Sequence, residues 1–198
     1  MASQPCPPSL SPSAPWSRRP AKEPPMRKAL PFLAVLILTA AASTASAQAP
    51  QPRQSIDIDR FMGRWYEIVR TPNDAQRNCH GANQTWARRS DGTFDIALYC
   101  HRDTPDGRLS TTRSRARITD PRTNAKFEAS FFGGIIKRQY WVIDRGDSYD
   151  WMIASTADGQ FVSILTRDPN VSASRLETLR ARARQLGLRT NTTQVVDH

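Results

Sequence analysis

The sequence predicts an all-β fold: an eight-stranded antiparallel up-and-down β-barrel with one C-terminal α-helix packed on its wall. Between residues 64 and 166, short runs of alternating apolar and polar residues follow one another and are separated by turn signals. After Pro169 the apolar residues recur at steps of three and four, which is typical of a helix. A chain of 198 residues has room for one such domain and additional segments.

The first 47 residues are expected to lie outside the barrel. Residues 1–25 hold eight of the 15 prolines and are predicted to be a disordered leader, unless translation begins at Met26. Residues 26–47 have a basic start, an apolar run over 29–42 and the ending Ala45-Ser46-Ala47, which together are typical of a secretory signal peptide. The apolar run is shorter than the roughly 20 residues that a membrane-spanning helix needs. The barrel domain is therefore predicted to occupy residues 48–198.

Eight segments of the domain have the alternation of a half-buried strand. They cover residues 64–70, 82–89, 93–100, 109–118, 125–132, 139–144, 149–155 and 160–166. Most of the turns between them are short and carry Gly, Asp or Pro, as at Asp91-Gly92 and Asp158-Gly159. Eight is the strand number at which a closed barrel can hold one small ligand.

Alternate residues of a strand point to opposite faces, so the apolar positions predict which side chains face the barrel interior. The predicted ligand-lining residues are Phe94, Ile96, Leu98, Ala116, Phe127, Ala129 and Phe131. Ser114, Ala116 and Ala129 are small, and this favours a cavity over a filled core, which stays the alternative.

The predicted helix follows the last strand. Leu176, Leu179, Ala183 and Leu186 form its apolar stripe, and Gly187 is expected to end it. Ser174 and Glu177 have the spacing of a capping box at its start.

The net charge of +10 comes mainly from scattered arginines. No run of basic residues is interleaved with aromatics, so no nucleic-acid partner is expected, whereas weak attraction to anionic membrane surfaces stays open.

The predicted domain contains two cysteines, Cys79 and Cys100. An even number of cysteines in a domain that is predicted to be exported favours one disulfide. Each cysteine is directly followed by a histidine, so the alternative to a disulfide is that these residues form a metal site or a reactive thiol. Neighbours on a strand point to opposite faces, however, so both members of such a pair rarely reach one metal. No metal and no cofactor are expected.

Four segments carry a resemblance to a known family. Residues 59–67 (DRFMGRWYE) contain G-x-W just before the first strand, and NAKFEASFF (124–132), YWVIDRGDSYDWMIAS (140–155) and ILTRDP (164–169) follow in order. Together they resemble the bacterial branch of the lipocalins that includes the outer-membrane lipoprotein Blc and is similar to apolipoprotein D. The resemblance implies binding, storage or transport of a small hydrophobic ligand, a fatty acid or lysophospholipid, in envelope lipid maintenance. The resemblance also implies that the protein is not an enzyme.

The resemblance also implies structural roles. Gly63 would permit a tight turn where a side chain would clash, and Trp65 would bury its ring at the barrel floor. Arg167 matches the arginine of the family's third motif and would cover that ring as a cation–π partner. Cys79 and Cys100 lie where many relatives carry a disulfide.

Glu67 shares its parity with Trp65 and Val69 and is expected to face the interior. It either forms hydrogen bonds within the barrel floor or meets a ligand headgroup. Two other functions therefore stay open: a haem or tetrapyrrole binder, against which the shortage of histidines argues, and a barrel enzyme with Glu67 as its base.

The family's lipoproteins carry a cysteine for acylation just after the apolar run, and residues 39–54 contain none. The protein is therefore expected to be periplasmic or secreted, with association with the outer membrane left open, and to be a monomer or a weak homodimer.

Overall fold

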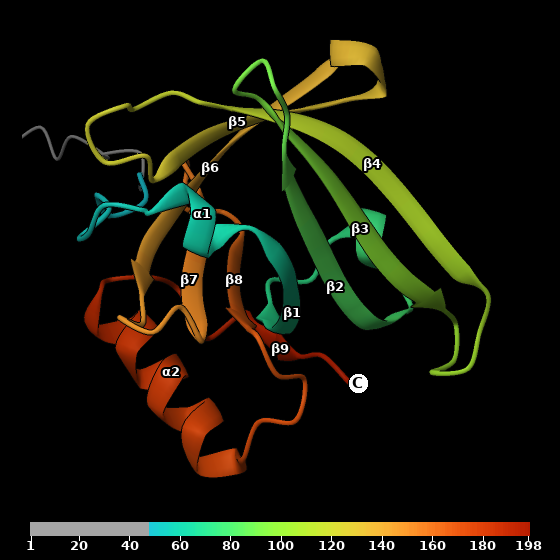
Figure 1. Cartoon of the computed structure of the whole chain (residues 1–198). Coiled ribbons are helices and arrows are strands. Elements are labelled where there is room, and N and C mark those ends of the chain that lie inside the picture. The colour runs from blue at the N-terminus through green and yellow to red at the C-terminus, as the bar shows by residue number, and fades with distance from the viewer. Residues whose placement is uncertain (1–47) are drawn as a thin grey trace, which may run out of the picture. The chain divides into compact units, whose positions relative to one another are not determined.

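Eight antiparallel strands close into a barrel in the computed structural model, which describes residues 48–198 (Figure 1). Strands β1 to β8 each pair with their neighbours in sequence, and pairing of β1 with both β2 and β8 closes the ring. The predicted barrel with one helix after its last strand is confirmed. The predicted leader 1–25 and signal peptide 26–47 lie outside the described residues.

The observed strand ends lie within three residues of the predicted ones. The barrel strands are β1 (Gly63–Arg70), β2 (Cys79–Arg88), β3 (Phe94–Arg102), β4 (Leu109–Ile118), β5 (Lys126–Phe131), β6 (Ile136–Arg145), β7 (Trp151–Thr156) and β8 (Val162–Thr166). The helices are α1 (Ile58–Phe61), α2 (Ala173–Gln185) and two single 3₁₀ turns, η1 (Asp74–Gln76) and η2 (Phe132–Gly134). A short strand, β9 (Gln194–Val195), completes the sheet. The sequence analysis did not anticipate α1, η1, η2 or β9.

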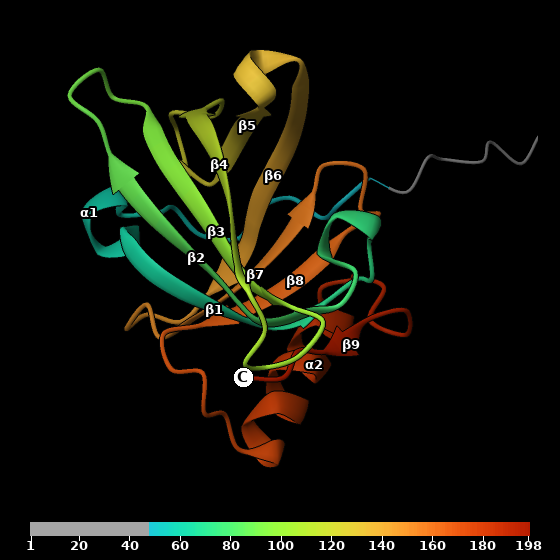
Figure 2. The ribbon, with the colours of Figure 1, turned by 90° about the vertical axis from the view of Figure 1, so that its right-hand side faces the viewer.

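The connections alternate between the two ends of the barrel, as they must in an up-and-down topology. The start of β1 with α1 and the β2–β3, β4–β5 and β6–β7 turns lie at one end, here called the α1 end. At the other end, the η1 end, lie η1, η2 and the β3–β4 and β7–β8 loops (Figure 2). In Figure 2, α1 lies on the left and η1 lies on the right, so the two ends can be told apart.

Helix α2 packs on the outside of the barrel, as predicted. Leu179 and Ala183 of its apolar stripe are buried against Val69 of β1, Ile143 of β6 and Ile164 of β8. Burial of this stripe holds a helix that would be marginal in isolation.

The expected capping box at Ser174 and Glu177 is wrong. The N-cap is Ser172, whose hydroxyl accepts a hydrogen bond from the amide of Arg175 at 3.3 Å. The helix begins two residues earlier than the capping-box spacing implied, because Ser172 offers the same cap.

The C-terminal segment lies in a seam where β1 and β2 diverge. Beyond Tyr66, β1 no longer pairs with β2, and Val69 pairs with Val195 of β9 instead. The amide of Val196 donates to Ile68 O at 3.0 Å, and Gly81 N of β2 donates to Asp197 O at 2.7 Å. The segment thereby satisfies backbone groups on both strands and completes the wall near the η1 end.

A disulfide joins Cys79, the first residue of β2, to Cys100 of β3, so the predicted pairing is confirmed. It packs against Ala82 and Val196 and anchors the seam.

Reduction of this disulfide should lower the free energy of unfolding by about 3 kcal/mol, because the bond closes a loop of 21 residues in the unfolded chain. Urea denaturation with and without dithiothreitol measures the change. The Cys79→Ser/Cys100→Ser variant is the control, since its stability should not respond to the reductant. Equal stability of the oxidised and reduced protein would contradict the prediction.

Candidate functional site

The interior of the barrel is most tightly packed at the α1 end. Five aromatic rings meet there, from Phe61, Trp65, Trp86, Phe94 and Phe127. Phe61 lies 5.6 Å from Phe127 in a stacked arrangement, and Trp86 lies 5.1 Å from each of these two rings at steep angles. These contacts are in the range of favourable aromatic pairs, so the cluster forms a solid floor.

Arg167 covers this floor from outside. Its guanidinium carbon lies 3.7 Å above the centre of the Trp65 ring, and Trp65 is fully buried. The same guanidinium donates hydrogen bonds to four backbone carbonyls, those of Arg60, Phe61, Arg64 and Tyr149. One side chain therefore joins α1, the start of β1 and the β6–β7 turn.

The structure gives a different reason for a glycine at position 63 from the one expected. A Cβ there would lie 3.5 Å from Arg167 Nη1, an ordinary contact, so no clash requires glycine. Its φ of +94°, however, is a conformation that side-chain-bearing residues rarely adopt.

The predicted lining residues all lie in the interior cluster. Five are buried members of it, namely Phe94, Ile96, Ala116, Phe127 and Ala129. Leu98 and Phe131 pack against it and are only partly buried. Phe94 pairs with Ala116, and Ala116 with Ala129, so these three form one row across β3, β4 and β5. Their contact with a ligand stays a prediction.

Four inward-facing residues outside this row keep some exposure to solvent. Leu98, Phe131, Tyr140 and Ala154 all pack against the interior cluster, yet each is only partly buried. We call the region that these four residues line the mouth half of the barrel. Inward-facing apolar side chains that keep solvent exposure leave apolar surface that a ligand could cover.

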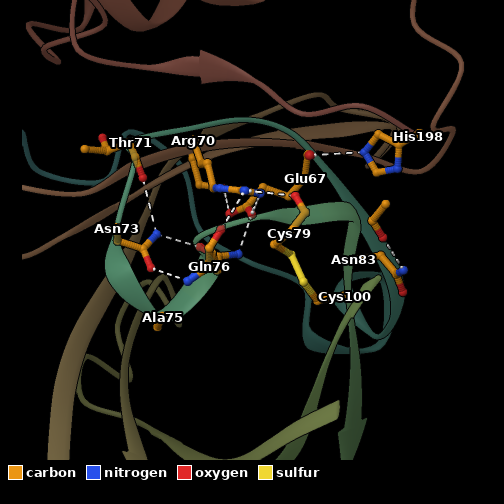
Figure 3. Close-up of polar contacts among 12 residues, drawn as sticks. Glu67, Arg70, Thr71, Asn73, Ala75, Gln76, Cys79, Asn83, Cys100 and His198 are labelled. Atoms are coloured by element: carbon orange, nitrogen blue, oxygen red, sulfur yellow. Dashed lines mark hydrogen bonds and ion pairs between the residues drawn. A yellow bond between two sulfur atoms is a disulfide. The ribbon is translucent and has the colours of Figure 1, made fainter. Parts of the chain in front are cut away.

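A buried acid–base pair borders the mouth half. A β-bulge between Glu67 and Val69 shifts the register of β1 against β8, and it changes which residues face inward after Glu67. Val69 packs outward beneath α2, contrary to the expectation from parity, and Arg70 is buried beside Glu67 instead. The Arg70 Nη1 atom lies 3.4 Å from Glu67 Oε2 (Figure 3).

Both oxygens of Glu67 are occupied by protein donors. Gln76 Nε2 donates to Oε2 at 2.7 Å (Figure 3), and Ser163 Oγ donates to Oε1 at 3.0 Å. Burial raises the pKa of Glu67, whereas the charge of Arg70 and the hydrogen bonds from Gln76 and Ser163 lower it in part. These partners come from η1 and β8 on the mouth side, so Glu67 is not bonded within the floor.

Arg70 fixes the β1–β2 loop. Its Nη2 donates to the carbonyls of Gln76 and Cys79, each at 3.1 Å (Figure 3). Within residues 48–198, its Nε has no hydrogen-bond partner although the side chain is only 2% exposed. Ser114 Oγ, on the inward face of β4, is likewise buried and unpaired there.

The sequence analysis missed Arg70, Gln76 and Ser163. Period-two reasoning places Glu67 and Arg70 on opposite faces, and only a bulge brings them together. It also missed Tyr140 and Arg138 on β6. Tyr140 packs against the interior cluster, so Arg138, two residues earlier, lies on the same face nearer the mouth.

The cysteine–histidine pairs do not form a metal site. Among the residues that the structure describes, no group of three or more His, Cys, Asp or Glu side chains could hold a metal ion. His101 Nδ1 lies 2.9 Å from Gly107 O, and His198 Nε2 donates to Glu67 O at 3.1 Å. His80 lies 3.9 Å from Asp197. His80 and His101 pair on the face of β2 and β3 opposite to Ile96 and Leu98, and His198 lies against the Tyr66 ring.

The family follows from a match to a known domain. Residues 56–198 match the family model described as "Lipocalin-like domain", which covers most of the chain. The chain belongs to the lipocalin family. Members of this family are generally binding or transport proteins.

Curated relatives agree with this assignment. The lipocalin is 26% identical to the outer membrane lipoprotein Blc of Citrobacter freundii over 164 residues, 79% of this chain and 91% of the relative. It is 28% identical to the Blc of Escherichia coli K12, with coverage of 72% and 82%. Apolipoprotein D of Mus musculus is 26% identical, with coverage of 61% and 66%.

Solved structures confirm the fold of this lipocalin. Insecticyanin from the tobacco hornworm Manduca sexta has a TM-score of 0.60 at 14% identity and covers 75% of this chain and 84% of its own. The cockroach allergen Per a 4 has a TM-score of 0.58 at 14% identity, with coverage of 77% and 94%. Within the described residues, no helix has the length and apolar character to cross a membrane.

Proposed function

We propose that this lipocalin binds a fatty acid or lysophospholipid with its acyl chain in the mouth half of the barrel. The observation that carries the proposal is the set of inward-facing apolar side chains that stay partly exposed there, Leu98, Phe131, Tyr140 and Ala154. A ligand that covered them would gain about 0.8 kcal/mol for each buried methylene.

The polar groups around the mouth half suit a single-chain amphiphile. Arg138 is exposed on the inward face of β6, and Tyr140 lies next to it on that face. Both could bind an anionic headgroup at the opening, where water still hydrates it in part. Glu67 is held by three donors from the protein, so we assign it a structural role and not contact with the headgroup.

The other two functions have less support. A haem would need an axial ligand such as histidine, but His80 and His101 pair on the outward face of β2 and β3, and His198 lies against the Tyr66 ring. A barrel enzyme would need Glu67 as a base, and its two oxygens already accept hydrogen bonds from Gln76, Ser163 and Arg70.

Export is part of the proposal. The signal peptide predicted over 26–47 would send the domain to an oxidising compartment, and the Cys79–Cys100 disulfide suits such a compartment. We propose storage or transport of lipids in the periplasm or outside the cell, in keeping with the names of the bacterial relatives, which are outer membrane lipoproteins.

Native mass spectrometry of the protein purified from an exporting host tests the proposal directly. We expect a co-purified species with the mass of a fatty acid or lysophospholipid, released on denaturation. A polypeptide that begins at Gln48 would at the same time support the predicted cleavage. An empty barrel that also fails to bind added fatty acid and lysophospholipid would contradict the proposal.

Filling the mouth half should weaken binding. Ala154 faces inward and pairs with Val142 and Ser163, so Ala154→Phe would occupy ligand volume. We expect about a tenfold loss of affinity, equivalent to the exclusion of about two methylenes. Displacement of a fluorescent fatty acid measures it.

The matched control is Ala97→Phe, which adds the same ring to the outward face of β3, beside Thr85 and Arg113. Its affinity should stay within about twofold of the original protein, since no ligand contact changes. Equal affinities of the two variants would show that the ligand lies elsewhere.

A further inference from the structure

The β5–β6 hairpin exposes an apolar tip at the η1 end of the barrel. Phe132 is 69% exposed, Ile135 85% and Ile136 42%. We call these three residues the hairpin tip. Figure 1 shows the hairpin, in gold, projecting at the upper right, and Figure 2 shows it at the top of the view. Three large apolar side chains in one five-residue stretch are more than the scattered exposure that is normal on a protein surface.

The backbone of the tip is held in an unfavourable conformation. Phe132 has a φ of 51°, a left-handed value that is rare for a bulky residue, and Gly133 and Gly134 follow with φ of 70° and 98°. Burial of the Phe132 ring within the protein does not offset this strain, because the ring is mostly exposed. Strained backbone of this kind clusters at functional sites, so the hairpin tip is a candidate binding surface.

Cations lie directly behind the tip on the outward face of the sheet. Arg115 of β4 and Lys137 of β6 both pair with Ser130 of β5, and Arg113 lies two residues nearer the tip along β4. All three are exposed. We call them the basic collar.

The carboxylates on this face only partly balance these cations. Asp95 lies 3.6 Å from Arg115, and Glu128 lies 4.0 Å from Lys137 but 3.1 Å from Arg117. Arg113 has no carboxylate within 4.0 Å among residues 48–198. The face behind the tip is therefore basic overall.

We propose that the hairpin tip inserts into the surface of a lipid bilayer that carries anionic headgroups. The hairpin carries apolar side chains at its end and cations one or two residues further back. A bilayer has the matching arrangement, because its anionic headgroups lie at the surface and its acyl chains lie below them. A second copy of this chain fits less well, because two tips in contact would bring two basic collars together. The β3–β4 loop, at the same end, carries Asp103 and Asp106 as well as Arg102 and Arg108, so it lacks the net positive charge of the basic collar.

Insertion of the hairpin tip would also provide a path by which the proposed ligand enters the barrel. The tip lies at the end where the mouth half opens, so insertion would bring the opening towards the bilayer. A single-chain lipid could then pass between bilayer and barrel with little of its acyl chain exposed to water.

Partition of the purified full chain onto phosphatidylcholine vesicles containing phosphatidylglycerol tests the inference, with co-sedimentation as the readout. The Phe132→Ser/Ile135→Ser variant should partition at least about tenfold more weakly, because two large side chains no longer enter the bilayer. The matched control is Leu109→Ser, which removes a 52% exposed apolar side chain from the β3–β4 loop and should change partition less than about twofold.

The basic collar has its own test. The variants Arg113→Gln and Lys137→Gln should each weaken partition about fivefold on vesicles with phosphatidylglycerol, and neither should do so on pure phosphatidylcholine. Circular dichroism and fatty-acid displacement should be unchanged in all these variants. Loss of vesicle binding with fatty-acid binding kept therefore separates this inference from the proposed function.

Two outcomes would overturn the proposal. In one, Phe132→Ser/Ile135→Ser partitions onto vesicles as well as the original chain does. In the other, sedimentation shows that the original chain forms a dimer that this variant lacks, so that a second copy covers the tip.

Discussion

Replacement of Arg70 by methionine is expected to lower the free energy of unfolding by about 3–5 kcal/mol, since it leaves the Glu67 carboxylate buried without its cation. Arg70 is 2% exposed and Glu67 is 8% exposed, so solvent screens this pair little. The substitution also removes the donors to the carbonyls of Gln76 and Cys79, which fix the loop between β1 and β2. Urea denaturation at neutral pH measures the loss.

Two control variants isolate the cause. In Glu67→Gln/Arg70→Met the carboxylate is neutral, so much of the lost stability should return. Arg77→Met removes an exposed arginine from the same loop and should change the stability by no more than about 0.5 kcal/mol. If the double variant were as unstable as Arg70→Met, the buried charge would not be the cause.

The same pair should make stability depend on pH. Burial raises the pKa of Glu67 above its ordinary value of 4.5, so the folded protein keeps this proton at a pH where the unfolded chain has lost it. Stability relative to Glu67→Gln should therefore fall as pH rises from about 4.5 to the raised pKa, and stay constant above it. In Arg70→Met the decline should extend to higher pH. A difference that does not change with pH would contradict the raised pKa.

Replacement of Arg167 by alanine should cost about 3 kcal/mol of stability, because four backbone carbonyls lose a charged donor and the Trp65 ring loses its cover. Thermal and urea unfolding, followed by tryptophan fluorescence, would report both the loss of stability and the exposure of Trp65. Fatty-acid affinity of the remaining folded protein should change little, since Arg167 lies at the α1 end, away from the mouth half.

Arg167→Lys tests geometry against charge. A lysine keeps the positive charge, but its single ammonium cannot reach four carbonyls and lie flat over the indole, so most of the loss should persist. Arg64→Ala removes an exposed arginine next to the same site and should be nearly neutral. Full rescue by lysine would show that charge alone matters at this position.

Local sequence patterns were sufficient for the barrel because a strand's side chains alternate strictly between its two faces. Phe94, Ala116 and Ala129 could be assigned to the interior one strand at a time, without knowledge of which strands pair. Turn residues separated the strands, and a change of period marked α2. The sequence motifs added what spacing could not, since G-x-W and the distant Arg167 were associated only through the family resemblance.

The sequence by itself determined the number of barrel strands, most of their faces, helix α2 and the cysteine pair, because each depends on residues that are close in the chain or on a count. Only the tertiary structure decided the site. The bulge after Glu67 depends on how β1 pairs with β8, and this bulge turns Arg70 inward and Val69 outward. The insertion of β9 beside β1 and the exposure of Phe132 likewise depend on which segments, far apart in the sequence, pack together and which find no partner.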